Sequence, residues 1–203
     1  STPLLANGVV VSGANWRGFY GNDAQTGELL WALDKDGITD RGATPACAGN
    51  LLYVASRQSL FIIDSRSGKV VVRKELPFNV QVNSTPLITD KLIVFGTQTD
   101  GLVALDRETF EVRWKVQTSP ALIYTAPYSR HPVATVETSP LLVGNTVYFG
   151  ASDGILYGVD KDSGQTVWKH KTGAPLFSTL ATDGRMIFAT DFGGNVYAFR
   201  CNE

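Results

Sequence analysis

Few residues in this chain have the type and spacing that catalysis or metal binding requires. The only two histidines, His131 and His170, form no HExxH or comparable ligand spacing, and we expect His170 at an exposed position near the end of an outer strand. The two cysteines, Cys47 and Cys201, form no CxxC pair. We also predict no strand-turn-helix nucleophile elbow, Walker loop or Rossmann glycine pattern in this chain. We therefore expect no catalytic residue, no metal site and no cofactor.

The sequence Asp160-Lys161-Asp162 could suggest a calcium site. Ca²⁺ needs six to eight oxygen ligands, which must converge from several segments. The same turn recurs elsewhere in the chain with other residues, so we interpret it as a capped hairpin loop.

His131 lies in the segment most suited to recognition. The sequence SPALIYTAPYSRHPVATVE, residues 119–137, adds about a dozen residues to a regular spacing. Loops on a rigid scaffold concentrate recognition, and Tyr and Arg are enriched among interface hot spots. The alternative is that Leu122, Ile123 and Tyr124 cover one end of the core or cap a sheet edge. The candidate partner-binding residues of this segment are Tyr124, Tyr128, Arg130 and His131.

A second candidate contact is the hairpin turn SGANWRGFYG, residues 12–21. Here Trp16 and Arg17 replace the small polar residues of the corresponding turns. An apolar side chain at a turn is exposed unless something covers it. Either a partner or an adjacent part of the fold would cover the Trp16 side chain.

These candidates are set into an internal repeat, which determines the fold. Four aspartates stand 41, 42 and 54 residues apart, and each is followed eight residues later by Trp or Val. The pairs are Asp23 and Trp31, Asp64 and Val72, Asp106 and Trp114, and Asp160 and Trp168. A second marker, as in STPLL and TSPLL, begins at Ser1, Ala43, Ser84, Thr138 and Phe177 with the same period. We expect the tryptophans to be packing anchors between repeats.

Each repeat predicts four antiparallel strands joined by tight turns that often contain Gly. Such a sheet buries neither face alone, so neighbouring copies must stack. The predicted fold is an all-β propeller of five four-stranded blades, or part of a larger propeller, with repeats at about 1–42, 43–83, 84–137, 138–176 and 177–203. A two-sheet sandwich would not need this fixed period. The last repeat lacks its outer strand, so we expect either a longer parent chain or edge-to-edge pairing with a second copy.

The motif Ala/Gly-x-Asp-x-x-Thr/Ser-Gly-x-x-x-Trp, as in YGVDKDSGQTVW, resembles the PQQ-like repeat of quinoprotein-type propellers. The resemblance implies two kinds of relative. Quinoprotein alcohol dehydrogenases bind pyrroloquinoline quinone and calcium on the axis and carry an adjacent cysteine pair and eight repeats. Non-enzymatic scaffolds similar to the bacterial outer-membrane assembly lipoprotein do not. The single cysteines and five repeats found here favour a scaffold.

Composition limits the partners. The chain has 203 residues and a net charge of −1, so it lacks the basic footprint of a nucleic-acid-binding protein. No apolar run is long enough to cross a bilayer. Only the resemblance favours a periplasmic or other extracytoplasmic location. We expect a non-catalytic scaffold for protein–protein contacts; the alternatives are a docking or regulatory domain of a larger enzyme, such as a phosphoesterase or kinase, and small-molecule or ion binding in the central channel.

Overall fold

The structure is a computed structural model that describes residues 2–13, 17–34, 37–38, 44–80, 83–123 and 135–201. Within these ranges all regular structure is β, in nineteen strands. No helix of the described chain is long and apolar enough to cross a membrane. The predicted contact residues Trp16, Tyr124, Tyr128, Arg130 and His131 lie outside the described residues.

The strands form five antiparallel sheets, one for each predicted repeat. The first sheet contains β1 (Leu4–Ala6), β2 (Val9–Gly13), β3 (Phe19–Asp23) and β4 (Leu29–Leu33). The second contains β5 (Ala46–Ala48), β6 (Leu51–Ser56), β7 (Ser59–Asp64) and β8 (Val70–Glu75). The third contains β9 (Leu87–Ile88), β10 (Leu92–Gly96), β11 (Leu102–Asp106) and β12 (Val112–Val116). The fourth contains β13 (Leu141–Val143), β14 (Thr146–Gly150), β15 (Ile155–Asp160) and β16 (Thr166–Lys171), and the fifth contains β17 (Ala181–Thr182), β18 (Met186–Thr190) and β19 (Val196–Arg200).

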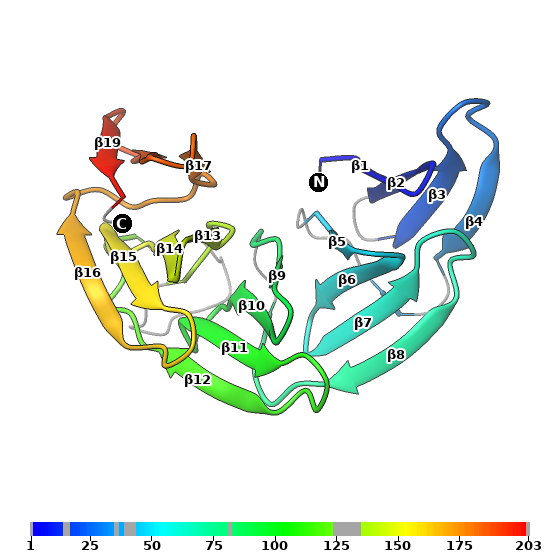
Figure 1. Cartoon of the computed structure of the whole chain (residues 1–203), viewed down its shortest axis with the longest axis horizontal. Coiled ribbons are helices and arrows are strands. Elements are labelled where there is room, and N and C mark those ends of the chain that lie inside the picture. Colours follow the sequence, from blue (N-terminus) through cyan, green and yellow to red (C-terminus); the bar gives the residue numbers. More distant parts are fainter. Residues whose placement is uncertain are drawn as a thin grey trace.

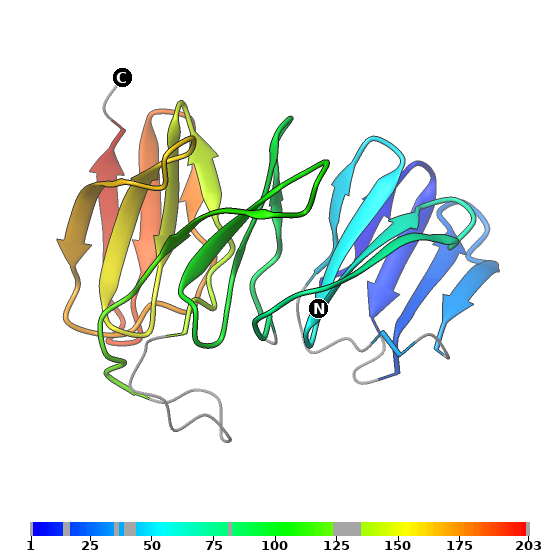
Figure 2. The same cartoon turned by 90° about the horizontal axis from the view of Figure 1, so that it is seen from below.

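The five sheets stand side by side along an arc, as the blades of a propeller do (Figure 1). The first strand of each blade lies toward the concave side, and the fourth strands β4, β8, β12 and β16 lie along the convex side (Figure 1). Blades 1 and 5 form the two ends of the arc, and a view from below shows the blades standing on edge (Figure 2). The predicted propeller is thus confirmed, and blade 5 has three strands among the described residues, as expected.

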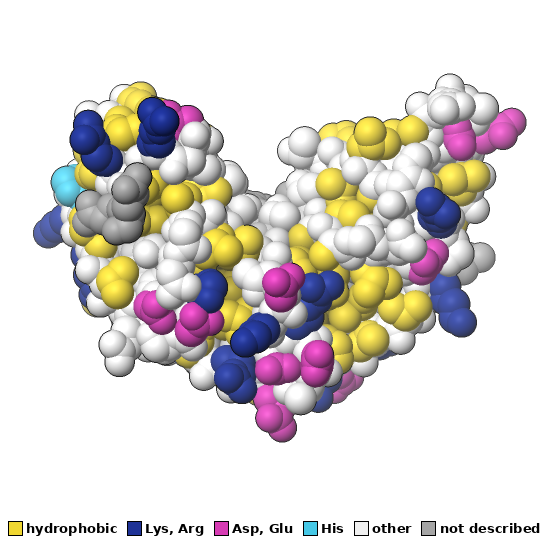
Figure 3. Space-filling model, in the orientation of Figure 1, with side chains coloured by type: hydrophobic (Ala, Val, Ile, Leu, Met, Phe, Trp, Pro, Cys, Tyr) yellow, Lys and Arg dark blue, Asp and Glu magenta, His cyan; other side chains and the backbone are white. Residues whose placement is uncertain are grey.

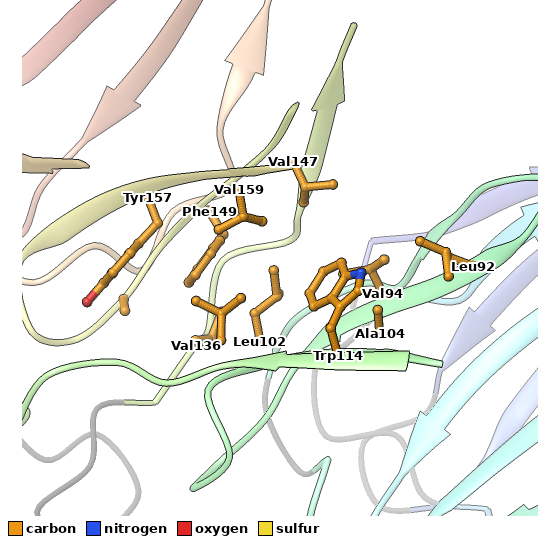
Figure 4. Close-up of a cluster of buried hydrophobic side chains, with 12 residues drawn as sticks. Leu92, Val94, Leu102, Ala104, Trp114, Val136, Val147, Phe149, Tyr157 and Val159 are labelled. Carbon is orange, nitrogen blue, oxygen red and sulfur yellow. The ribbon is translucent and has the colours of Figure 1, made fainter. Parts of the chain in front are cut away.

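Each pair of neighbouring blades encloses its own hydrophobic core, because alternate residues of a strand point to opposite faces. Between blades 3 and 4, the side chains of Leu102 and Trp114 face Phe149 and Val159 (Figure 4). Phe149 is fully buried, and its ring stacks on that of Tyr157 at 4.8 Å between centroids. Similar clusters join blades 1 and 2, blades 2 and 3, and blades 4 and 5. The blades are therefore held together mainly by apolar burial.

The turn between the third and fourth strands has the same geometry in blades 1 to 4. In blade 4, Asp160 Oδ1 accepts hydrogen bonds from the backbone N–H groups of Asp162 and Ser163, and the Gly164 N–H donates to Asp160 O at 2.9 Å. The Ser163 hydroxyl also donates to Asp160 Oδ1, at 2.7 Å, and this bond together with the backbone N–H bonds to Oδ1 holds the pKa of Asp160 below its usual value. Asp160-Lys161-Asp162 is thus a capped hairpin turn, as the sequence indicated.

Two tryptophans connect neighbouring blades through this turn. The Trp31 indole N–H of blade 1 donates to Ser65 O of blade 2 at 3.0 Å, and a Cβ atom at Gly68 would lie 2.6 Å from Trp31 Cγ. Trp114 of blade 3 repeats both contacts with blade 4, where its N–H donates to Lys161 O at 2.9 Å over Gly164. We call this arrangement the indole seat: a carbonyl one residue after the turn Asp and a positive-φ glycine four residues after it. The predicted anchor role of Trp31 and Trp114 is confirmed.

The junction between blades 2 and 3 lacks the tryptophan and fills the space differently. Val72 occupies the tryptophan position, and Phe110 occupies the glycine position of the next turn at φ +60°. Ile62 stands opposite Val72 in the sheet, where blades 1 and 3 have the small residues Gly21 and Ala104 opposite their tryptophans. All three side chains belong to the core between blades 2 and 3. Larger residues on both sides therefore replace the indole.

The outer strand of blade 4 departs from one expectation. His170 is half-buried, not exposed, and its ring lies 4.7 Å from that of Phe199 and 6.1 Å from that of Trp168. The prediction for His170 was wrong because it ignored the aromatic residues of blade 5. Trp168 itself is half-buried against Tyr148 and Phe199.

Candidate interaction surface

One side of the arc carries the described residues of both segments that the sequence singled out. In an antiparallel four-stranded blade, the turn between strands two and three lies on the same side as the connection to the next blade. Arg17 belongs to that turn in blade 1 and is exposed. The segment 117–140, which includes the predicted loop, connects blades 3 and 4 on the same side. The described residues on this side are therefore the candidates for a partner contact.

The described start of the connecting segment is fixed to blade 4. The Ser119 N–H donates to Asp153 Oδ2 at 2.9 Å, and the Leu122 N–H donates to Ser152 O at 2.9 Å. In spite of these backbone contacts, the side chains of Leu122 and Ile123 are 50% and 41% exposed. The expected alternative, that these residues cover the core, therefore accounts for their backbone but not for their exposed side chains.

Asp153 is the polar centre of this arrangement and is only 4% exposed. Its carboxylate accepts hydrogen bonds from the N–H groups of Ser119 and Ile155 and from the Tyr157 hydroxyl at 2.5 Å. Burial raises the pKa of Asp153, although the three hydrogen bonds oppose the shift. Burial and the hydrogen bond to Asp153 likewise raise the pKa of Tyr157. A buried carboxylate with three donors holds the connecting segment in one position.

Blade 5 presents a second exposed apolar group at its own turn between β18 and β19. Phe192 is 72% exposed, and its ring meets that of Phe177 edge-on at 5.7 Å. Its N–H donates to Pro175 O at 2.8 Å. Asp191 fixes the turn by accepting hydrogen bonds from Asn195 and from the Tyr197 hydroxyl at 2.8 Å. Phe192 is therefore held outward on a well-ordered turn.

Short distances through small residues link these apolar groups across blades 4 and 5. A Cβ atom at Gly154 would lie 2.8 Å from Leu122 Cδ1 and 3.1 Å from Ala174 O. A Cβ atom at Gly193, next to Phe192, would lie 3.3 Å from Ala174 Cβ. Three small residues, Gly154, Ala174 and Gly193, thus lie between Leu122 and Phe192. We call this the blade 4–5 surface; its apolar members are Leu122, Ile123, Phe177 and Phe192.

Sequence analysis missed the contribution of blade 5 to this surface. The signal that could have found it is the turn TDFGG, residues 190–194, where Phe192 stands among small and polar residues just as Trp16 does in blade 1. Of the predicted contact residues, only Arg17 is described; it is exposed in the turn between β2 and β3 and makes no ion pair with a described residue. All six contact residues stay predictions.

The opposite side holds a polar pocket of about 490 Å³ between blades 3 and 4, which is lined by Asp90, Lys91, Leu92, Asp106, Glu108, Arg113 and Asp162. Charged side chains of both signs gather over the middle of the arc (Figure 3). Arg113 lies 3.8 Å from Asp106 Oδ2, and Asp106 Oδ1 caps its own turn. In the described chain, no three His, Cys, Asp or Glu side chains are placed to hold a metal ion.

The inner strands begin with hydroxyl residues that link the blades near the concave side. The Thr2 N–H donates to Thr44 Oγ1 at 3.1 Å, and the Thr85 N–H donates to Ser139 Oγ at 3.0 Å. The Thr179 hydroxyl contacts that of Ser139 at 3.3 Å. The recurrent Ser/Thr-Pro marker therefore has a structural role between blades.

Comparisons with known proteins show the family to which this architecture belongs. The profile of the family described as outer membrane protein assembly factor BamB matches residues 19–203. This chain belongs to that family. It is 29% identical to the BamB of Vibrio cholerae over 154 residues, which cover 73% of this chain and 39% of that protein. It is also 28% identical to the dehydrogenase subunit of a quinone alcohol dehydrogenase from Gluconobacter oxydans, over 84% of this chain and 19% of the relative.

Solved structures show the same fold. BamB from Moraxella catarrhalis superposes with a TM-score of 0.74 at 20% identity, over 97% of this chain and 59% of that one. A quinohemoprotein alcohol dehydrogenase from Pseudomonas putida superposes with a TM-score of 0.73 at 18% identity, over 98% of this chain and 40% of the other. The chain thus spans less than two thirds of each of these proteins. The expected PQQ-like propeller, with relatives of both the scaffold and the dehydrogenase kind, is confirmed.

Proposed function

We propose that this chain is a non-catalytic scaffold that binds a protein partner through the side of the arc carrying the connection between blades 3 and 4. The observation that carries the proposal is the blade 4–5 surface, where Leu122 and Phe192 expose half or more of their area. Exposed apolar groups that lie together on an ordered surface are typical of protein–protein contacts. Membership of a family named for outer membrane protein assembly supports a scaffold and an extracytoplasmic location.

The rigidity of the surface supports the same function. Asp153 and Asp191 hold the two turns through hydrogen bonds to tyrosine hydroxyls at 2.5 and 2.8 Å. A surface that is ordered before binding loses little conformational entropy when a partner docks. The predicted residues Tyr124, Tyr128, Arg130 and His131 come shortly after Leu122 and Ile123 in the sequence, and the proposal includes them in the contact. The proposal also includes Trp16 and Arg17 of blade 1 as a second contact.

Relatives that are dehydrogenases raise the question of catalysis. Those relatives use a quinone, but Cys47 and Cys201 are single free cysteines in β5 and after β19. The adjacent cysteine pair that the resemblance implies for the dehydrogenases therefore has no counterpart in this sequence. This supports the non-catalytic proposal.

The test is crosslinking capture of partners from an envelope extract of the source organism. The triple variant Leu122→Ser, Ile123→Ser, Phe192→Ser should lose a partner that the wild-type chain captures. The matched control removes equally exposed apolar groups from outer strands: Leu29→Ser, Val112→Ser, Val167→Ser. The control should keep the partner, and both variants should keep the wild-type melting temperature. Retention of all partners by the first variant, or equal loss in both, would contradict the proposal.

A further inference from the structure

The outer strand of blade 4 carries two lysines that no described carboxylate neutralises. Lys169 and Lys171 are exposed in β16, and neither makes an ion pair with a described residue. Alternate residues of a strand share a face, so both side chains lie on the same face of β16. That face is turned toward blade 3, because Lys169 Nζ lies 5.1 Å from the ring centre of Tyr157, which belongs to the core between blades 3 and 4 (Figure 4).

Protection of the strand edge does not explain this pair of lysines. Lysines on an edge strand commonly prevent pairing with other chains, and one cation for each strand can serve this purpose. In blades 1, 2 and 3 the position of Lys171 is not basic and holds Asp34, Glu75 and Gln117. The second lysine is therefore specific to blade 4 among these four repeats.

Blade 3 shows how a lysine at the first position is neutralised. Lys115 occupies the position of Lys169, and its Nζ lies 2.8 Å from Asp100 Oδ1 in the turn between β10 and β11. The same turn of blade 4 also contains an aspartate, Asp153. Its carboxylate is only 4% exposed and already accepts three hydrogen bonds. Lys169 thus lacks the ion pair of blade 3, because the aspartate of its own blade holds the connecting segment.

The two lysines adjoin the apolar start of the connecting segment. A Cβ atom at Gly154 would lie 2.8 Å from Leu122 Cδ1, and the Thr172 N–H donates to Gly154 O at 2.8 Å. Ile155, which follows Gly154, stands opposite Lys171 in the sheet. One contact can therefore cover the exposed Leu122 side chain and reach both ammonium groups.

The neighbouring parts of the chain supply no obvious counter-charge. Residues 124–134, which follow the apolar start in the sequence, contain Arg130 and His131 and no acidic residue. Blade 4 has a described blade on each side, so this site does not belong to an open end of the arc (Figure 1). Both observations favour a carboxylate from another molecule.

From these observations we propose that Lys169, Lys171, Leu122 and Ile123 bind an extended acidic segment of a protein partner. The two lysines are one strand repeat apart, about 7 Å, which matches carboxylates at alternate residues of an extended peptide. An apolar residue beside the carboxylates packs on Leu122 and Ile123. A membrane surface fits less well, because basic clusters that bind anionic lipids contain about four to eight cations. The inference rests on the proposed function, since both use Leu122 and Ile123, and it adds the chemistry of the partner.

The probe is the synthetic peptide SDVEVFLS, which has two acidic residues at alternate positions followed by an apolar pair. It is titrated into the full 203-residue chain and followed by NMR. We expect saturable shifts of the amide signals of Lys169, Lys171 and Leu122. The uncharged peptide SNVQVFLS should bind at least about threefold more weakly, because it loses two exposed ion pairs of modest strength. This difference should shrink at about 1 M salt, where exposed charges are screened.

Two double variants make the test specific. Lys169→Gln with Lys171→Gln should bind the acidic peptide as weakly as the wild type binds the uncharged one. Lys69→Gln with Lys74→Gln is the matched control, because it removes the same charge from exposed positions of blade 2. The control should bind like the wild type. Both double variants should keep the wild-type melting temperature, since substitutions at exposed positions cost little stability.

Three outcomes would overturn the proposal. The first is equal binding of the acidic and uncharged peptides by the wild type, and the second is equal loss of binding in both double variants. The third is binding to phosphatidylglycerol vesicles that Lys169→Gln with Lys171→Gln abolishes, without any binding of the peptide, because the occupant would then be a lipid surface.

The capture experiment separates this inference from the proposed function. A partner that is lost by the triple variant of Leu122, Ile123 and Phe192 but kept by Lys169→Gln with Lys171→Gln would support the proposed function and overturn the acidic segment. Loss of the same partner in both variants, with retention in the blade 2 control, would support both.

Discussion

The indole of Trp114 covers Gly164 of the next blade, and its N–H donates to Lys161 O at 2.9 Å. The tryptophan comes from an outer strand and the glycine from a turn 50 residues later in the chain. The contact thus connects two repeats at the convex side of the arc, where the blades diverge and apolar packing alone would be thinnest. The stability of the fold should therefore depend on this contact.

Removal of the indole should destabilise the fold strongly. Trp114 is 7% exposed, so Trp114→Ala should lower the free energy of unfolding by about 3 to 5 kcal/mol. Denaturant unfolding measures the change. Val112→Ala on the same strand, at a side chain that is 41% exposed, is the control and should stay within about 0.5 kcal/mol of wild type. A loss below about 1 kcal/mol for Trp114→Ala would show that the indole is not an anchor.

The junction between blades 2 and 3 should accept the missing tryptophan only if its seat is opened. Val72→Trp alone should clash with Phe110, and Phe110→Gly alone should leave a void. The double variant should be more stable than the sum of the two changes, with a coupling of about 0.5 to 3 kcal/mol. A double-mutant cycle by urea unfolding gives this number. Strict additivity would mean that the two positions do not share one space.

The seat glycines should be more sensitive to substitution than other positive-φ glycines. Gly144→Ala strains only the backbone, because nothing lies within 4 Å of its would-be Cβ, and should cost about 1 to 2 kcal/mol. Gly164→Ala adds a Cβ only 2.6 Å from Trp114 Cγ, so it should cost about 1 to 3 kcal/mol more through overpacking. Thermal unfolding of both variants compares them directly. Equal losses would argue against close contact of the indole with the turn.

The turn aspartates should make the fold sensitive to acid. Backbone hydrogen bonds from Thr109 and Glu108 lower the pKa of Asp106 in the folded state. A carboxyl with a lowered folded pKa contributes stability above its unfolded value, about 3.9, and loses it as the pH falls through the folded pKa. Asp106→Asn should therefore flatten the decline of unfolding free energy below about pH 4. An equally steep decline in the wild type and in Asp106→Asn would contradict this.

Asp153 should behave in the opposite sense. Burial raises its pKa, so the ionised carboxylate destabilises the fold at high pH. This destabilisation is lost as the pH falls from the folded pKa toward the unfolded value. Asp153→Ala should still destabilise the fold by about 1 to 3 kcal/mol, because the Ser119 N–H and the Tyr157 hydroxyl lose their acceptor. Hydrogen exchange at the Ser119 and Leu122 amides should accelerate. Unchanged exchange at both amides would show that Asp153 does not hold the segment.

The repeat was sufficient to predict the fold, since Asp23 and its three counterparts mark turns whose geometry is local. The same periodicity predicted the anchors Trp31 and Trp114. It could not predict the environment of His170, which depends on Phe199 and Tyr197 in the next blade. It also missed Phe192 as part of the blade 4–5 surface, because proximity across blades to Leu122 follows from stacking and not from spacing. Contacts between repeats are where single-sequence patterns carry least information.

The indole seat also bears on how such repeat proteins gain blades during evolution. Every repeat that carries a turn glycine and, four residues later, a tryptophan contains both halves of a contact it never makes with itself. Tandem duplication of one such unit therefore creates a matched junction at once, whatever the number of copies. Divergence of the repeat sequences is harder, because a substitution on one side of a junction requires a compensating substitution in the adjacent repeat, as Val72 and Phe110 illustrate. Substitutions should therefore occur in pairs, at contacting positions of successive repeats. Gain or loss of a whole blade should be easier to tolerate than a single uncompensated substitution.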